Sequence, residues 1–80
     1  MSITLRRHHR RGTCSWREFT RALEQARFVL VRKHGSHAVY VHEPSGHTLA
    51  LLCSGRDVPN GTLAKLLRSV RSITGLDLEF

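Results

Sequence analysis

The spacing of hydrophobic residues changes twice along this chain, and each change marks a new element. Beyond residue 15, apolar side chains recur at steps of three and four, at Trp16, Phe19, Leu23 and Ala26. This period predicts an amphipathic helix of about three turns, with these side chains packed in the core. Ser15 and Glu18 have the spacing of a capping box, so the helix is predicted to begin there.

The apolar pattern then shortens to a period of two, which is typical of strands. Three runs rich in β-branched, aromatic or alternating apolar residues follow, at 27–33, 37–43 and 47–53. The short turns between them favour an antiparallel meander of three strands. In the middle strand, alternation places His37, Val39 and Val41 on one face. Tyr40 then falls on the opposite face, where it is predicted to meet a partner.

A Pro-Asn-Gly loop precedes a return to the helical period. The apolar positions of this second helix are Leu63, Leu66, Leu67 and Val70. Its outer face carries Lys65, Arg68 and Arg71, and Gly75 is predicted to end it. Residues 76–80 form a short tail that is expected to add an apolar anchor.

The order of these elements predicts an α+β fold. It is a small αβββα domain in which both helices cover one face of a three-stranded antiparallel sheet, and the other face is left to solvent or a partner. Residues 14–80 are predicted to form this single domain, and residues 1–13 a basic, flexible arm. The arm holds Arg6, Arg7, Arg10 and Arg11. It is either a solvated tail or a segment that reaches for phosphates.

Charge narrows the choice of partner. Thirteen Lys and Arg against six Asp and Glu give a formal net charge of +7 in 80 residues. This excess favours a polyanion, nucleic acid before an anionic membrane, and an acidic protein also satisfies it. No apolar run approaches the roughly 20 residues of a membrane span, and no hydrophobic segment follows the N-terminal charges, so neither a span nor a secretory signal is expected. Two cysteines outside any C-x-x-C pair indicate reduced thiols in a cytoplasmic protein.

Candidate chemistry centres on His37, which directly follows a Gly-Ser turn at the start of a strand. Histidine has an ordinary pKa of about 6.5, so it takes or gives a proton near neutral pH. Arg32, Lys33 and His34 lie close by in sequence and supply positive charge. Ser36 is placed to hold a phosphate oxygen. The alternative is a polar residue that ends a turn and bonds a neighbouring carbonyl.

Two further sets of residues have candidate roles. His42, Glu43 and His47 flank the next turn, but a closed metal site needs three or four ligands with supporting bonds, so solvated hairpin residues are the preferred interpretation. No metal or cofactor is expected.

The start of the second helix points free backbone N–H groups outward, and Thr62 adds a hydroxyl, which suits a phosphate. Lys65 and Arg68, three residues apart, continue the positive charge along the outer face of this helix. The alternative is a normally capped amphipathic helix with a polar outer face.

Three stretches together carry a resemblance to a known family: "FVLVRKHGSHAVYVH", "GTLAKLLRSV" and the terminal "LDLEF". In this order they resemble the HicA toxin family, also called YcfA-like, from about Ser15 to Phe80. The resemblance implies a double-stranded-RNA-binding-domain-like fold and endoribonuclease activity on messenger RNA. It also implies a type II toxin–antitoxin system in which a HicB-type antitoxin neutralises the toxin. The catalytic histidine of the family lies in its G-S-H motif, which corresponds to His37.

The chain departs from the family pattern in three ways. Arg27 stands where the family often has a glycine that ends the first helix, so the helix is expected to end differently. Leu51 and Cys53 stand where a proline and a second histidine often occur. The basic arm is longer than the pattern needs.

The favoured reading is a metal-independent ribonuclease in which His37 acts as general acid or base. Six residues are assigned to RNA binding: Arg32, Lys33, Ser36, Thr62, Lys65 and Arg68. The alternative is a non-catalytic RNA-binding module on the same fold, which the loss of the second histidine at Cys53 favours. A third reading is a domain that chiefly contacts an acidic protein.

Overall fold

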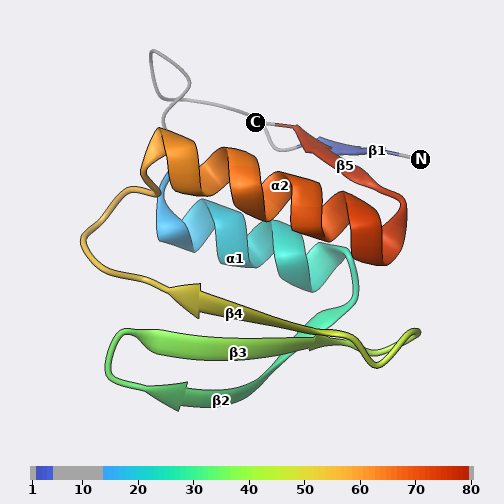
Figure 1. Cartoon of the computed structure of the whole chain (residues 1–80), viewed down its shortest axis with the longest axis horizontal. Helices are drawn as coiled ribbons and strands as arrows, with labels where there is room; N and C mark the ends of the chain where they lie inside the picture. The colour runs from blue at the N-terminus through green and yellow to red at the C-terminus, as the bar shows by residue number, and fades with distance from the viewer. Residues whose placement is uncertain (1, 5–13, 80) are drawn as a thin grey trace.

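The computed structural model of the chain describes residues 2–4 and 14–79. Its elements follow in this order: β1 (Ser2–Thr4), α1 (Trp16–Gln25), β2 (Phe28–His34), β3 (His37–His42), β4 (Thr48–Leu52), α2 (Asn60–Thr74) and β5 (Asp77–Glu79). The strands β2, β3 and β4 form an antiparallel sheet in that spatial order. Both helices lie on the same side of this sheet (Figure 1). The predicted α+β architecture is therefore confirmed.

Two short strands lie outside the predicted pattern. Residues 2–4 pair in parallel with residues 77–79, so β1 and β5 form a second, two-stranded sheet. It lies beyond α2 from the three-stranded sheet (Figure 1). Leu78 in β5 is buried in the core, as expected of the apolar anchor. The strand β1 falls inside the predicted arm, and that prediction did not include it; the arginines of the arm lie outside the described residues.

The capping box starts α1 as predicted. The Ser15 hydroxyl accepts a hydrogen bond from the Glu18 backbone N–H at 3.1 Å, and the Glu18 carboxylate accepts one from the Ser15 N–H at 3.0 Å. Trp16 and Phe19 are both buried and meet edge to face, with ring centroids 6.2 Å apart. The Trp16 indole N–H donates to the Ser54 carbonyl at 3.2 Å. This bond ties α1 to the segment that follows β4.

The end of α1 corrects one prediction. Arg27 was expected to force a different helix ending from the glycine of the family, but Arg27 itself adopts the left-handed conformation, with φ of 72°. Its N–H donates to the Glu24 carbonyl at 3.1 Å, and its carbonyl accepts from the Glu43 N–H at 3.1 Å. A side chain in this region costs about 1–2 kcal/mol, so Arg27 holds strain that a glycine would not.

The core lies between the helices and one face of the sheet. Its strand residues are Phe28, Ala38, Tyr40, Leu49 and Leu51, and they pack with apolar residues of both helices. Tyr40 is only 5% exposed. The prediction that it faces a partner was therefore wrong, because Ala38 and Tyr40 occupy the inner face. Val39 and Val41 are half-buried and belong to the outer face.

A β-bulge interrupts the pairing of β2 with β3. Leu30 lies opposite Tyr40 and Arg32 lies opposite Val39, so Val31 is an extra residue without a partner. Because side chains alternate between faces, one extra residue exchanges the faces of everything that follows it in the strand. Leu30 is on the inner side of the sheet, and Arg32 is on the outer side.

We predict that Arg27→Gly stabilises the domain. Glycine adopts positive φ without the Cβ clash, although it also loses more backbone entropy on folding, so the expected net gain is about 0.5–1 kcal/mol. In a domain of this size, that gain raises the melting temperature by about 3–6 °C. Thermal unfolding followed by circular dichroism measures it. Arg27→Ala keeps the strain and is expected to leave the melting temperature nearly unchanged; equal shifts for both variants would assign the effect to the lost arginine side chain.

Candidate functional site

The turn between β2 and β3 fixes the position of His37. Gly35 and Ser36 form the two-residue turn, and Gly35 has φ of 60° while Ser36 has no positive φ, which is the pattern of a type II′ turn. The Ser36 carbonyl accepts a hydrogen bond from the Cys53 N–H at 2.7 Å. His37 therefore sits at the start of the central strand, between His34 on β2 and Leu52 on β4.

The bulge at Val31 determines which basic residues share a face with His37. Residues directly opposite in an antiparallel pair have side chains on the same face. Arg32 lies opposite Val39 and His34 lies opposite His37, so both are on the outer face with His37. Lys33 lies opposite Ala38, on the inner side. Of the residues predicted near His37, the structure brings Arg32 and His34 to its face of the sheet and places Lys33 on the other, and Ser36 lies in the turn directly before His37.

The side chain of His37 is exposed. Within residues 14–79, no side chain forms a hydrogen bond with its ring. The imidazole is thus open to a ligand that approaches the outer face. The alternative, in which the ring bonds a neighbouring carbonyl, finds no such carbonyl among the described residues.

Cys53 lies on the opposite side of the sheet from His37. It is half-buried and lines a pocket of about 170 Å³ together with Lys33, Ala38 and Tyr40. Burial raises the pKa of the Cys53 thiol, and the Lys33 ammonium partly opposes that rise. A histidine at this position would therefore not share a face with His37.

The predicted residues of α2 lie in two places: Thr62 lines a pocket, and Lys65 and Arg68 lie on the outer side of the helix. Thr62, Lys65 and Arg68 are all exposed. Pro59 precedes the helix and no side chain caps its first N–H groups. Thr62 lines a pocket that also includes Leu52, the cross-strand neighbour of His37. Successive helix residues are rotated by about 100°, so Lys65 and Arg68, two and five residues after Leu63, lie on the side of the helix away from this buried residue.

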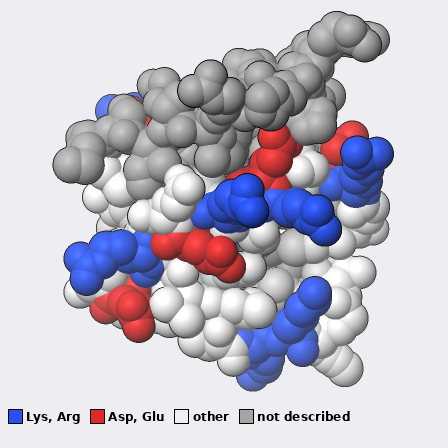
Figure 2. Space-filling view, turned by 180° about the vertical axis from the view of Figure 1, so that it is seen from behind, with Lys and Arg blue, Asp and Glu red and all other residues white. Residues whose placement is uncertain are grey.

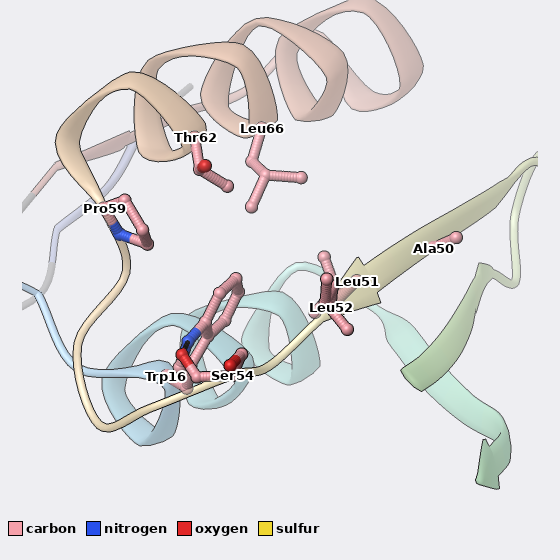
Figure 3. Close-up of a pocket in the computed structure, with 8 residues that line it drawn as sticks. All are labelled: Trp16, Ala50, Leu51, Leu52, Ser54, Pro59, Thr62 and Leu66. Carbon is pink, nitrogen blue, oxygen red and sulfur yellow. Dashed lines mark hydrogen bonds between the residues drawn. The ribbon is translucent and has the colours of Figure 1, made fainter. Parts of the chain in front are cut away.

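This pocket, with a volume of about 220 Å³, lies between β4, α1 and the start of α2. Figure 3 shows the Trp16 indole on one side and Pro59, Thr62 and Leu66 on the other, with Leu52 at the end of β4 beside them. Its walls are mainly apolar, and the Thr62 hydroxyl adds a polar group. Of the predicted helix residues, only Thr62 lines this pocket, which connects it to Leu52 on β4, the strand next to His37.

The outer face of the sheet carries exposed apolar side chains, apart from the polar Arg32, His34 and His37 near the β2–β3 turn. Val29 is 40% exposed and Leu52 is 54% exposed. The strands β2, β3 and β4 contain no Asp or Glu. Figure 2 shows basic side chains at the lower right, the end of the sheet that holds the β2–β3 turn, with no acidic side chain beside them in this view. The sequence predicted that this face is left to solvent or a partner, but it did not predict the exposed apolar side chains there; their signal was the unbroken apolar run of residues 28–31.

The second candidate, the turn after β3, has a structural role in the described residues. His42 is 8% exposed, stacks at a tilt on Phe28 with centroids 5.1 Å apart, and its Nδ1 lies 2.8 Å from the Ser45 hydroxyl. Among residues 2–4 and 14–79, no group of three His, Cys, Asp or Glu side chains is arranged to hold a metal ion. No helix in this part of the chain is long and apolar enough to cross a membrane.

Comparison with known proteins adds one finding. The family model described as HicA toxin of bacterial toxin-antitoxin matches residues 16–71. Searches of curated proteins and of solved structures found no match. The matched segment runs from the first residue of α1 into the last turn of α2, and it includes every predicted site residue.

We predict that the two thiols react very differently in the folded protein. Burial, with smaller contributions from the Glu18 and Asp57 carboxylates, raises the pKa of Cys14 from 9.0 to about 11. Because only the thiolate reacts, that rise alone lowers the reactive fraction of Cys14 about 100-fold at neutral pH. The thiol reagent DTNB should label Cys53 first, at a rate that increases from pH 7 to pH 9, and should label Cys14 only after unfolding.

Two variants check the assignment. Cys53→Ser should leave no thiol that reacts in the native state. Lys33→Ala removes the cation that lowers the pKa of Cys53, so labelling at pH 8 should slow further. Equal labelling rates for the two cysteines, or faster labelling of Lys33→Ala, would contradict this account.

Proposed function

Because the chain belongs to the HicA toxin family, we propose that this toxin is an endoribonuclease that cleaves messenger RNA with His37 and is neutralised by a HicB-type antitoxin. The observation that carries the proposal is the placement of His37. Its exposed imidazole stands on the rigid central strand, on the same face as Arg32 and directly after a tight turn that contains Ser36.

The proposed chemistry follows from these neighbours. His37 takes the proton of a ribose 2′-hydroxyl, and the 2′-oxygen forms a bond with the adjacent phosphorus. The bond between phosphorus and the 5′-oxygen breaks, and the leaving 5′-oxygen gains a proton. Negative charge that develops on the phosphoryl oxygens is stabilised by the Arg32 guanidinium, and the Ser36 hydroxyl holds a phosphate oxygen. One acid–base group of this kind contributes roughly 10²–10⁴-fold to the rate. The scheme requires a 2′-hydroxyl, so it acts on RNA and leaves DNA intact.

The proposed RNA path extends from the β2–β3 turn toward α2. The Thr62 hydroxyl and the uncapped first turn of α2 offer donors to a phosphate, and the pocket beside Leu52 connects them to the strand next to His37. Lys65 and Arg68 extend the positive charge along the outer side of the helix. Lys33, on the inner side of the sheet edge, contributes to attraction at longer range.

The alternative proposal is an RNA-binding module without catalysis. It is favoured by Cys53, which stands where the family often has a second histidine. The position of Cys53 on the inner side of the sheet weakens this argument for the alternative, because a residue there does not share a face with His37.

The outer face of the sheet supports a docking site for the antitoxin. It combines exposed apolar side chains, Val29 and Leu52 among them, with the Arg32 guanidinium and the His34 imidazole, and its strands contain no acidic residue. An acidic protein that packs apolar side chains on this face buries hydrophobic surface and pairs a carboxylate with Arg32. Because His37 is on the same face, such a partner also covers the proposed active site.

The first test is cleavage of a labelled RNA by the purified protein in excess chelator. Wild-type protein is expected to cut RNA and to leave an all-deoxy strand intact. His37→Ala is expected to cut about 10²–10⁴-fold more slowly and still bind the RNA. If both proteins bind and neither cuts, the RNA-binding module replaces the enzyme; if His37→Ala cuts as fast as the wild type, another group is the catalyst.

The second test addresses the antitoxin. Val29→Glu places a carboxylate on the outer face, away from the turn that holds His37, and should repel an acidic partner while leaving cleavage intact. When co-produced with a HicB-type antitoxin that neutralises the wild type, Val29→Glu should still arrest growth. The control Ser72→Glu adds the same charge on exposed α2 and should remain neutralised. Full neutralisation of Val29→Glu would place the antitoxin on another surface.

A further inference from the structure

Two histidines face each other at the mouth of the β2–β3 turn. His34 and His37 are direct cross-strand partners, and both are exposed. Residues opposite each other in an antiparallel pair have Cα atoms roughly 4.5–5.5 Å apart and side chains on the same face. Neither ring forms a hydrogen bond with a side chain of the described residues, so both imidazoles are open to the same ligand.

The pairing depends on the bulge at Val31. Without that extra residue, Lys33 would lie opposite His37 and His34 would fall within the turn. With it, Arg32 and His34 lie two residues apart on one face of β2, next to His37 on β3. Arg32, His34 and His37 therefore form a triangle of polar side chains on the outer face.

The strand residues around this triangle on the outer face are uncharged. On β4, the outer residues Leu52, Ala50 and Thr48 are uncharged, and on β3 they are Val39 and Val41. Arg32 is the charged residue that shares the face, since Lys33 and Cys53 are on the inner side. The three strands contain no Asp or Glu. Near neutral pH histidine exists in both protonation states, so the pair can offer one base and one acid.

We propose that His34 is the general acid of the cleavage reaction, with His37 as its base; this rests on the proposed function. His37 accepts the proton of the 2′-hydroxyl, and a bond forms between the 2′-oxygen and phosphorus. The bond between phosphorus and the 5′-oxygen breaks, and the His34 imidazolium donates its proton to that oxygen. The products are a 2′,3′-cyclic phosphate and a free 5′-hydroxyl, and the two histidines exchange protonation states.

The arrangement suits this division of labour. Attack and departure take place on opposite sides of the phosphorus, so the base and the acid must approach the phosphate from two sides. The two rings extend from neighbouring strands on one face, and Arg32, on the same face of β2 as His34, is placed to contact the non-bridging oxygens of a phosphate bound there. A single histidine would have to perform both proton transfers in turn.

The test uses a DNA strand with one ribonucleotide, so that only one linkage is cleavable, at a site that the wild type cuts. In a second version, sulfur replaces the 5′-oxygen of that linkage. A thiolate leaves without a proton, so the sulfur substrate does not need a general acid. His34→Ala is expected to cut the oxygen substrate about 10²–10⁴-fold more slowly and the sulfur substrate at nearly the wild-type rate. His37→Ala should be slow on both.

The pH dependence gives an independent readout. Wild-type cleavage of the oxygen substrate should follow a bell-shaped pH profile, and His34→Ala should lose the limb that falls at high pH. His34→Gln keeps the size and polarity of the side chain and should behave like His34→Ala. The matched control His47→Ala removes an exposed histidine from the other turn and should retain the wild-type rate and profile.

The outcomes separate this inference from the function on which it rests. If the wild type cuts and His37→Ala does not, the function stands, and the sulfur substrate alone decides the role of His34. Equal losses on both substrates would make His34 a binding residue, and a wild-type rate for His34→Ala would remove it from the reaction; either result overturns the proposal. If the wild type cuts neither substrate, the function and the role of His34 fail together.

Discussion

One extra residue in β2 determines which side chains reach the outer face of the sheet. Before Val31, strand alternation places Phe28 and Leu30 on the core side; after it, alternation resumes with the faces exchanged. Without the bulge, Arg32 would point toward the helices and Lys33 would oppose His37. The bulge lies on an edge strand, where pairing is lost on one side only and an unpaired residue is tolerated. The composition of the proposed active site is thus a matter of register.

A tight network of backbone contacts then holds this register. The Gly35-Ser36 turn closes one end of the hairpin, and the bond from Cys53 to the Ser36 carbonyl fixes that turn to β4. At the other end, the Arg27 carbonyl accepts from Glu43, so the entry to β2 is tied to the exit of β3. His37 is consequently held from both neighbouring strands, while no described side chain forms a hydrogen bond with its ring.

The sequence predicted those features that depend on local spacing. The capping box of Ser15 and Glu18, the core positions Trp16 and Phe19, and the end of α2 at Gly75 follow from near neighbours in the chain, and the structure confirms them. The faces of β3 were assigned correctly as pairs, but Tyr40 was placed toward a partner because a strand pattern does not say which face the helices cover. The left-handed Arg27 and the bulge at Val31 carry no local signal, since Arg27 occupies a position that favours glycine and residues 28–31 form one unbroken apolar run.

Separation of the two sheet faces explains how so small a domain carries both a core and a site. An 80-residue chain buries only a modest core, and here the inner face supplies the strand contribution to it. The outer-face residues Val29, Val39, Val41 and Leu52 lie outside this core cluster, so they are available for binding. Under the proposed function, RNA and the antitoxin use this same face, and the apolar residues that would be a liability in a lone domain become the surface that the antitoxin covers. Inhibition then requires no change of shape in the toxin, because a partner bound to Val29 and Leu52 already lies across His37.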